Sequence, residues 1–260
     1  MKLPPLKIFI FLLSFVVIFS CKSDDDEDNI DDPKAENLKA LGTSAEDILS
    51  DDLYTSLTVE LIYSDGFRPL QETINSFRSF LDERVNKPDG IQIVETIIDA
   101  PQNAPFTTEE IRNIESNNRT QYTEGDNIAV SIFFSNGISD NDSETRVTLG
   151  KAYRNTSVVV YEKTIMDVSV LPNGPDLYKL EATTLQHEFS HLFGLVNILG
   201  DDIHTNHEDP NNSKHCIVED CLMYFESTNA NKVALRNMQL PNIPQLDPLC
   251  IADLRAKGGK

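Results

Sequence analysis

The chain of 260 residues has no tryptophan, four cysteines and 22 basic residues against 42 acidic ones, which gives a formal charge of −20. The shortage of basic residues, which form no cluster, excludes nucleic acid as a partner, because the acidic field would repel it. No internal repeat is present, which argues against a repeat architecture. With 40% hydrophobic side chains, the composition predicts one globular domain of about 200 residues.

Apolar residues are concentrated at the N-terminus, where two lysines precede the run IFIFLLSFVVIF at residues 8–19. A run of this length is short for a membrane span and is typical of an export signal. The stretch IFSC that follows resembles a bacterial lipobox, in which the cysteine is acylated and becomes the first residue of the mature chain. We therefore expect residues 1–20 to be a lipoprotein signal peptide and Cys21 to carry the lipid anchor. An uncleaved N-terminal anchor is the alternative.

The segment after Cys21 is strongly acidic, since residues 24–32 (DDDEDNIDD) supply seven acidic groups and no base. A block of like charges cannot collapse, so we expect residues 21–45 to form an acidic disordered tether. The start of this segment, KSDDDED, resembles the signal that sends some Gram-negative lipoproteins to the outer face of the outer membrane. The expected location is therefore the outer membrane, lipid-anchored and surface-exposed. A spacer that carries no address is the alternative.

Strand and helix patterns alternate from Tyr54 onward. β-Branched and aromatic residues predict strands over residues 56–64, 91–98, 127–135 and 156–165. Apolar periodicity predicts helices over residues 71–86 and 107–117, the second opened by a capping signal. Residues 136–150 are rich in turn formers. The pattern predicts an α+β fold with an α/β-like N-terminal part and a mixed, mostly parallel twisted sheet.

A further helix is predicted over residues 176–193, ending at Gly194, and it carries the sequence HEFSH. His187 and His191 are one turn apart on one face, about 6 Å along the axis, so both can bind one ion. A zinc ion with three protein ligands keeps a fourth position for water and lowers the pKa of that water. Glu188 would then be the general base in peptide hydrolysis. Two satisfied core histidines are the alternative.

The segment HCIVEDCLM at residues 215–223 resembles the archaemetzincins, zinc metalloproteases of the metzincin clan, in which the third zinc histidine precedes a cysteine pair and a methionine turn. The resemblance implies that His215 is the third zinc ligand and that Met223 lies beneath the metal as an apolar floor. Residues 197–214 would be an insertion before that ligand. Asn197 would then begin a loop rather than replace a histidine.

Two other histidines lie in this insertion. His207 is within reach of a returning loop and is the alternative third ligand, whereas His204 is expected to be a solvated loop residue. The metzincin resemblance further implies an active-site helix, a small irregular C-terminal subdomain, and a strand before the helix that pairs with an extended substrate. Residues 156–165 occupy that place.

Archaemetzincins bind another zinc ion with four cysteines, but Cys216, Cys221 and Cys250 are the three that remain here once Cys21 is lipidated. In an exported protein, three cysteines favour one disulfide and one spare thiol. Cys216 and Cys221 are the nearest pair, and Cys250 is a competing partner. Because Cys21 alone precedes the motif, we expect no cysteine-switch propeptide.

These observations predict that residues 46–260 form a zinc metalloprotease domain in a bacterial lipoprotein. The predicted activity is a membrane-anchored zinc-dependent endopeptidase that acts on protein or peptide substrates, and we expect a monomer. The alternative is a non-catalytic surface binding lipoprotein that retains a metzincin fold. Glu188 favours the enzyme, since a binding module needs no base beside the ion.

Overall fold

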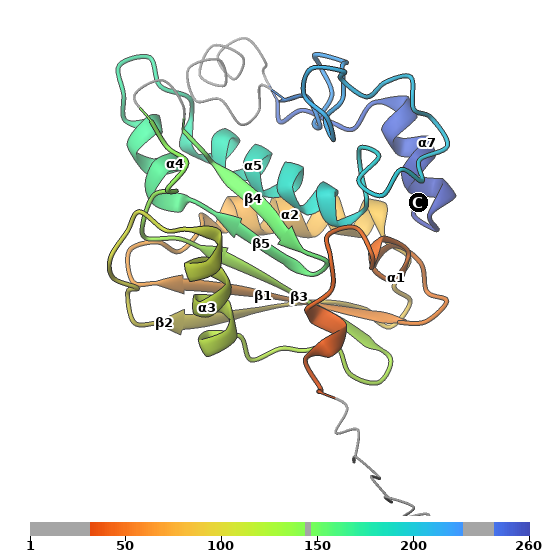
Figure 1. Cartoon of the computed structure of the whole chain (residues 1–260), viewed down its shortest axis with the longest axis horizontal. Helices are drawn as coiled ribbons and strands as arrows, with labels where there is room; N and C mark the ends of the chain where they lie inside the picture. Colours follow the sequence, from red (N-terminus) through yellow and green to blue (C-terminus); the bar gives the residue numbers. More distant parts are fainter. Residues whose placement is uncertain (1–31, 144–146, 226–241) are drawn as a thin grey trace, which may run out of the picture. The chain divides into compact units, whose positions relative to one another are not determined.

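The computed structural model describes residues 32–143, 147–225 and 242–260. Its centre is a five-stranded sheet (Figure 1), and the order of the strands is β2 (Gly90–Ile98), β1 (Ser56–Ser64), β3 (Asn127–Phe134), β5 (Ser157–Val160) and β4 (Gly150–Arg154). Strands β2, β1, β3 and β5 run parallel, and β4 pairs antiparallel with β5. The predicted mixed, mostly parallel sheet is therefore confirmed.

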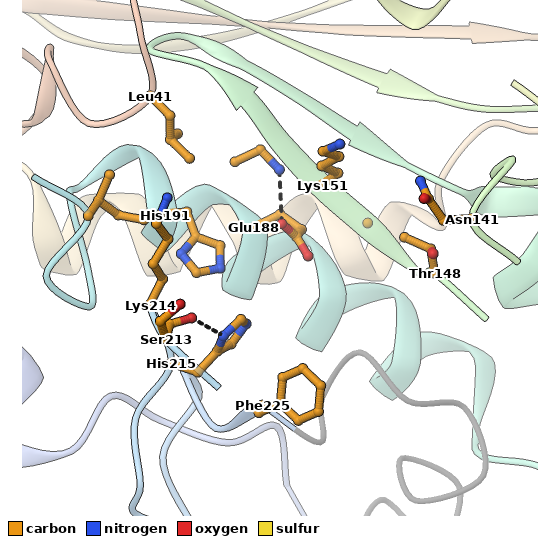
Figure 2. Close-up of a pocket in the computed structure, with 13 residues that line it drawn as sticks. Leu41, Asn141, Thr148, Lys151, Glu188, His191, Ser213, Lys214, His215 and Phe225 are labelled. Atoms are coloured by element: carbon orange, nitrogen blue, oxygen red, sulfur yellow. Dashed lines mark hydrogen bonds between the residues drawn. The ribbon is translucent and has the colours of Figure 1, made fainter. Parts of the chain in front are cut away.

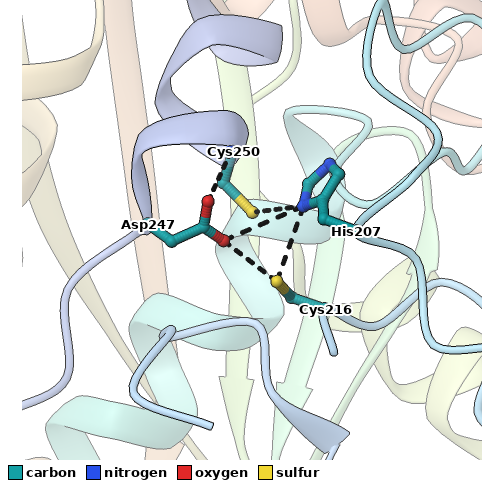
Figure 3. A group of neighbouring side chains, drawn as sticks. All are labelled: His207, Cys216, Asp247 and Cys250. Carbon is teal, nitrogen blue, oxygen red and sulfur yellow. Dashed lines mark hydrogen bonds and ion pairs between the residues drawn. The ribbon is translucent and has the colours of Figure 1, made fainter. Parts of the chain in front are cut away.

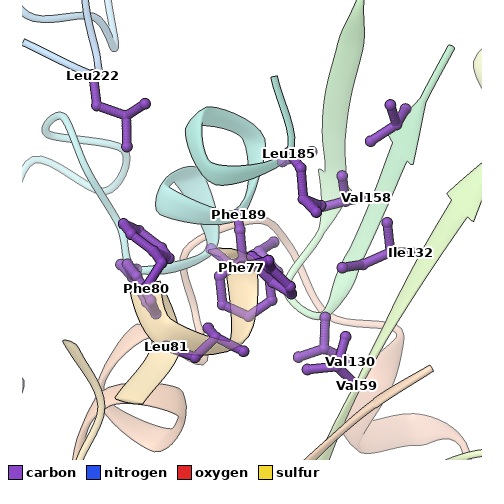
Figure 4. Packing of buried hydrophobic residues seen from close by; sticks show 14 of the residues in the cluster. Val59, Phe77, Phe80, Leu81, Val130, Ile132, Val158, Leu185, Phe189 and Leu222 are labelled. Atoms are coloured by element: carbon purple, nitrogen blue, oxygen red, sulfur yellow. The ribbon is translucent and has the colours of Figure 1, made fainter. Parts of the chain in front are cut away.

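Helices cover both faces of this sheet. On one face, α2 (Gln71–Arg84) and α5 (Leu177–Leu192) pack over alternate strand residues such as Val59, Val130 and Val158, as Figure 4 shows. On the other face, Ile111 of α3 (Thr108–Asn118) packs with Ile62 of β1 and its neighbours. Successive strand residues point to opposite faces, so strands with apolar residues at both parities are buried on both sides.

The predicted helices follow their sequence signals. In α2 the buried face comprises Ile74, Phe77, Phe80 and Leu81, which recur at helical spacing. Helix α3 begins with a capping box, in which the Thr107 side chain accepts a hydrogen bond from the Glu110 backbone and the Glu110 carboxylate accepts one from Thr107. Both helices were predicted to within two residues at each end.

The prediction of a fourth strand over residues 156–165 was wrong in its second half. Strand β5 ends at Val160, and α4 (Glu162–Ser169) follows, burying Ile165 and Val168 at helical spacing. The β-branched residues before Tyr161 predicted a strand, and the change from strand to helical spacing after Tyr161 was missed. Strand β4 was not predicted, because it begins at the last residue of the segment that was expected to form turns.

The same finding corrects the expected substrate strand. Strand β5 lies inside the sheet between β3 and β4, so its edges are occupied. Among the described residues, the free edge beside the active-site helix belongs to β4, which α5 contacts. Strands β4 and β5 form a hairpin whose two turn residues are Asn155 and Thr156.

The folded unit begins at Asp32, earlier than the predicted boundary at residue 46. A short 3-10 helix, η1 (Ala35–Asn37), and helix α1 (Ala45–Leu49) precede the first strand. Asn37 is completely buried, and its side chain donates to Thr123 Oγ1 and to the carbonyl oxygen of Ala129, both at 2.9 Å. The part of the predicted tether from residue 32 to residue 45 therefore belongs to the folded unit.

The described residues between α5 and α7 are irregular, as predicted. Residues 194–224 contain turns and isolated bridges but no regular helix or strand, and α7 (Pro248–Ala256) ends the chain. Within residues 32–143, 147–225 and 242–260, no helix is long and apolar enough to cross a membrane. The predicted signal peptide and Cys21 lie outside the described residues.

Candidate metal centre

Helix α5 carries the predicted zinc-binding sequence through the interior. It starts after Asp176, whose side chain accepts a hydrogen bond from the Lys179 backbone, and it stops where Gly194 adopts a left-handed φ of +78°. His187, Glu188 and His191 are all buried. The helix boundaries were predicted to within one residue at each end.

Three histidines meet at the C-terminal half of this helix. The ring centroids of His187 and His191 are 4.9 Å apart, and that of His215 lies 5.3 Å from each. One ligand nitrogen from each ring lies within 4.8 Å of the other two. Of the two candidates for the third position, the structure places His215 beside the pair, whereas His207 belongs to a different cluster.

Each of these rings is oriented by a backbone carbonyl. The Nδ1 atom of His187 donates to Leu222 O at 2.7 Å, that of His191 to Leu195 O at 2.8 Å, and that of His215 to Ser213 O at 3.0 Å. A proton fixed on Nδ1 leaves Nε2 deprotonated on all three rings. Metal-bound histidines are held in this way, by a hydrogen bond from the nitrogen that does not bind the metal.

Burial favours the neutral form of the imidazoles. It lowers the pKa of His191 to about 3, with a smaller contribution from the charge of His215. Burial also lowers the pKa of His215 below its usual value. Because histidine binds metal as the neutral ring, the residues present fit a zinc ion.

Glu188 is held against the edge strand. Its Oε2 accepts a hydrogen bond from the backbone nitrogen of Ala152 in β4, at 3.0 Å. Two residues earlier, Gly150 leaves room for the carboxylate, because a Cβ at that position would lie 2.5 Å from Glu188 Cγ. Burial raises the pKa of the Glu188 carboxyl to about 8, against the opposing hydrogen bond from Ala152. A positive metal ion beside this carboxyl would lower its pKa and favour the carboxylate, which is the form that accepts a proton.

The glutamate and two of the histidines open into a cleft of about 400 Å³ (Figure 2). Strand β4 forms one wall, and the loop that carries His215 forms another. The lining residues are Leu41, Asn141, Thr148, Gly150, Lys151, Ala152, Glu188, His191, Ile198, Ser213, Lys214, His215 and Phe225.

The loop over residues 197–214 connects the helix to His215. Asn197 adopts a left-handed φ of +54°, and its side chain donates to Glu208 Oε2 at 3.0 Å. It therefore starts the loop rather than reaching the histidines. The carbonyl oxygen of His215 accepts from Asp209 N at 2.8 Å, and Cys216 N donates to Met223 O at 2.8 Å. These bonds fix the backbone on both sides of His215.

A second cluster of metal-binding side chains lies in the C-terminal part (Figure 3). It comprises His207, Cys216, Asp247 and Cys250, all buried. His207 Nδ1 lies 3.5 Å from Cys216 Sγ and 3.7 Å from Cys250 Sγ, and Asp247 Oδ2 lies 2.9 Å from Cys216 Sγ. Cys221 borders the cluster, with its Sγ 3.7 Å from that of Cys250.

The predicted disulfide is wrong for the described cysteines. Cys216, Cys221 and Cys250 are all thiols, and the spacing of 3.7 Å between the sulfurs of Cys221 and Cys250 is far longer than a disulfide bond of about 2.05 Å. Donors around a tetrahedral zinc ion lie roughly 3.3–3.8 Å apart, given bonds of about 2.0–2.3 Å. The sulfur and histidine spacings in this cluster match that range, so the residues fit a metal.

His207 has the orientation of a metal ligand within this cluster. Its Nε2 atom pairs with Asp253 Oδ2 at 2.9 Å, which directs Nδ1 toward the sulfurs. A carboxylate that holds the outer nitrogen of a histidine is a recurrent arrangement around bound metals. The other oxygen of Asp253 accepts from His204 Nδ1 at 2.9 Å, so His204 is tied to α7 and is half-buried rather than a freely solvated loop residue.

The pKa values of the neighbouring thiols are shifted in opposite directions. Hydrogen bonds from Cys216 and then from Cys250 lower the pKa of Cys221 to about 5. The hydrogen bond to Cys221 raises the pKa of Cys216. The pKa of Cys250 is raised as well, chiefly by its hydrogen bonds with Cys216 and Cys221. The two donor cysteines, Cys216 and Cys250, are therefore thiols without a metal, and a bound metal would displace their protons.

Comparison with solved structures finds the crystal structure of archaemetzincin from Methanopyrus kandleri. The sequence identity is 17%, the TM-score is 0.49, and the alignment covers 78% of this chain and 96% of that one. No protein-family model matches the sequence, and none of the curated proteins does. A likeness of this size says nothing of activity, which has to be inferred from the residues of the site.

Several residues of the two centres were not anticipated from the sequence. Gly150 is the last residue of the segment predicted to be turn-rich, and Ala152 follows it by two residues. The available hint was the turn former Asn155 between two short apolar stretches. Asp247 could have been noticed as a helix cap followed by proline, three residues before Cys250. Nothing in the sequence pairs His207 with these residues, because they meet through the folding of irregular loops.

Proposed function

We propose that this chain is a zinc-dependent endopeptidase. The proposal depends on one observation: three neighbouring histidines each donate a hydrogen bond from Nδ1 to a backbone carbonyl. Glu188 follows the first of them, His187, on helix α5. His187, His191 and His215 would hold the ion through Nε2. A zinc ion in that position supplies a Lewis acid that polarises a carbonyl oxygen and activates water.

Glu188 does the proton transfer in this proposal. Its carboxylate faces the cleft from the helix and is oriented by the Ala152 backbone, so it can take a proton from an attacking water. The same carboxyl can then give the proton to the amine that leaves. A chain that only bound ligands would not require a base in this position, which disfavours the non-catalytic alternative.

The substrate would be an extended peptide. Strand β4 ends the sheet on the side of the cleft, so its outer edge can pair with a peptide backbone. The amide of Ala152 donates to Glu188 from this outer edge, and backbone groups at alternate positions of β4 face the same way and would pair with the peptide. Pairing of this kind would hold the scissile bond between Glu188 and the histidines.

The second cluster would hold a structural metal ion. Its donors, a histidine, two thiols and a carboxylate, are all buried, as in closed zinc sites that stabilise a fold without binding substrate. The chain directly joins the two centres, since His215 and Cys216 are consecutive. We infer that the second ion would fix the loop that presents His215.

We further propose that the enzyme is lipid-anchored through Cys21 at the outer membrane, exposed at the cell surface, and monomeric. Support comes from the IFSC sequence and from the acidic run that follows it. The substrates would then be proteins or peptides outside the cell membrane.

Glu188→Gln tests the proposed chemistry. This change keeps the size of the side chain and removes the proton acceptor, so bound zinc should be retained while peptide hydrolysis falls by about two or more orders of magnitude. The measurement is zinc content together with turnover of a quenched fluorescent peptide library. Hydrolysis at the wild-type rate in this variant would rule out Glu188 as the base.

A further inference from the structure

One end of the cleft is built by a segment that lies before the first strand. Residues 34–44, named here the N-terminal strap, are attached to the turn between β4 and β5 through Asn155. The Asn155 side chain donates to Glu36 O at 2.7 Å and to Ser44 Oγ at 2.9 Å, and its backbone nitrogen donates to Lys39 O at 3.2 Å. The strap is therefore fixed to the far end of the edge strand.

This attachment places Leu41 in the cleft. Leu41 and Ile198 both line it next to His191, and both are half-buried. The strap and the loop after α5 are in direct contact at Gly42, where a Cβ would lie 2.7 Å from Ile198 Cγ2. Two segments far apart in the sequence thus form one apolar wall.

The direction of β4 assigns this wall to one side of a bound peptide. Strand β4 runs from Gly150 to Arg154, and the strap is attached just beyond Arg154. Figure 2 shows Leu41 at the end of the cleft beside His191, and Asn141 and Thr148 at the other end. A peptide that pairs antiparallel with β4 has its amino-terminal residues at the Arg154 end.

We propose that Leu41 and Ile198 form a specificity subsite that takes an apolar side chain on the amino-terminal side of the scissile bond. This inference rests on the proposed peptidase function. Packing an aliphatic side chain against Leu41 and Ile198 removes apolar surface from water, whereas a carboxylate there would lose its hydration without gaining a partner. The subsite selects aliphatic or aromatic residues over acidic ones.

The test compares peptides that differ at one position. Quenched fluorescent peptides carry either Leu or Asp at each of the three positions before and the three positions after the scissile bond. The expected result is a preference for Leu of about tenfold or more in kcat/KM at a position before the bond. Leu41→Ala removes apolar contact without adding a charge and should reduce that ratio by about tenfold, and Ile198→Thr should reduce it as well.

Leu38→Ala is the matched control, because Leu38 belongs to the same strap but is exposed and lies outside the cleft. It should leave the Leu-to-Asp ratio unchanged. A preference that is unchanged in both Leu41→Ala and Ile198→Thr would overturn the subsite. A preference confined to positions after the scissile bond would do the same, since it would reverse the peptide direction.

Peptide binding to Glu188→Gln protein, measured by fluorescence anisotropy, separates this inference from the proposed function. If no peptide is hydrolysed by the wild type, the peptidase proposal fails. The subsite still predicts that the Leu peptide binds at least about tenfold more tightly than the Asp peptide, and that adding Leu41→Ala reduces this difference. Equal binding of the two peptides would overturn the subsite by itself.

Discussion

His187 donates a hydrogen bond to the carbonyl oxygen of Leu222, 2.7 Å away, and so the residue before Met223 orients the first histidine of the HEFSH sequence. The methionine turn thereby contacts the site through its backbone. Met223 itself is fully buried, and its carbonyl oxygen accepts the Cys216 amide. The turn links the first histidine, the second cluster and the segment that carries His215.

Single substitutions should separate the two metal centres. The wild type should bind about two zinc ions per chain. His215→Ala should lose the ion beside Glu188 and peptide hydrolysis with it. His207→Ala should lose the other ion, because His207 is paired with Asp253 in the cysteine cluster. Zinc content and hydrolysis of each purified variant would be measured side by side.

Asn197→Ala is the control for that comparison, since Asn197 bonds Glu208 and touches neither centre. It should keep both ions. If His207→Ala abolished the catalytic ion while His215→Ala kept it, the ligand assignment would be wrong.

Gly150→Ala should disturb catalysis without removing a catalytic group. The new Cβ would lie 2.5 Å from Glu188 Cγ, so either the carboxylate or the edge strand must move. A misplacement of about 1 Å can cost about 100-fold in rate, and we expect a loss of about 10- to 100-fold in kcat/KM with zinc content unchanged. Gly66→Ala controls for backbone strain without a clash, because Gly66 has a φ of +82° and a Cβ there would meet no atom within 4 Å. Equal activity of Gly150→Ala and wild type would contradict the tight packing of Glu188.

The buried pair Glu162 and Glu181 should make stability depend on pH. Burial, followed by the charge of Glu181, raises the pKa of Glu162 to about 9 from its ordinary 4.5. Its contribution to stability is therefore complete below about pH 4.5 and is lost as pH rises toward 9. Glu162→Gln keeps the neutral form, so its melting temperature should gain on the wild type as pH rises from 5 to 9.

Thermal melts at several pH values measure that difference. Glu83→Gln, at a glutamate whose side chain is 62% exposed, provides the comparison for a surface position. If the difference in melting temperature between Glu162→Gln and wild type stays constant across the range, the pKa of Glu162 is not raised in the folded protein.

Cys21→Ser tests the anchor. If Cys21 is acylated, the substitution should move the protein from the membrane fraction to a soluble or unprocessed form, because buried acyl chains contribute about 0.8 kcal/mol per methylene. Metabolic labelling with a fatty acid analogue and fractionation of cells provide the measurement. Lipid labelling that persists in Cys21→Ser would exclude this residue as the attachment site.

The sequence correctly predicted those elements that depend on residues close together in the chain. The spacing of His187 and His191 follows from helical geometry, and the capping box at Thr107 from two side chains three residues apart. The first three strands of the sheet were predicted because they are rich in β-branched and aromatic residues. Features of this kind depend on neighbours within a few residues.

The errors concern contacts between distant segments. Strand β4 is short, begins in a turn-rich segment, and is a strand because it pairs with β5. The cysteine cluster unites His207, Cys216 and Cys250 through loops that have no period. Asn37 is buried by contacts with residues far along the chain, such as Ala129 of β3. The acidic sequence around Asn37 therefore did not indicate that this segment is folded.

The most direct test of the central claim is anomalous X-ray scattering at the zinc absorption edge from crystals of the wild-type protein. The account predicts a peak between the Nε2 atoms of His187, His191 and His215, with each Nδ1 still bonded to its carbonyl oxygen. A second peak is expected among His207, Cys216, Asp247 and Cys250. Absence of the first peak in zinc-saturated crystals, with the three imidazoles in place, would contradict the proposed catalytic centre.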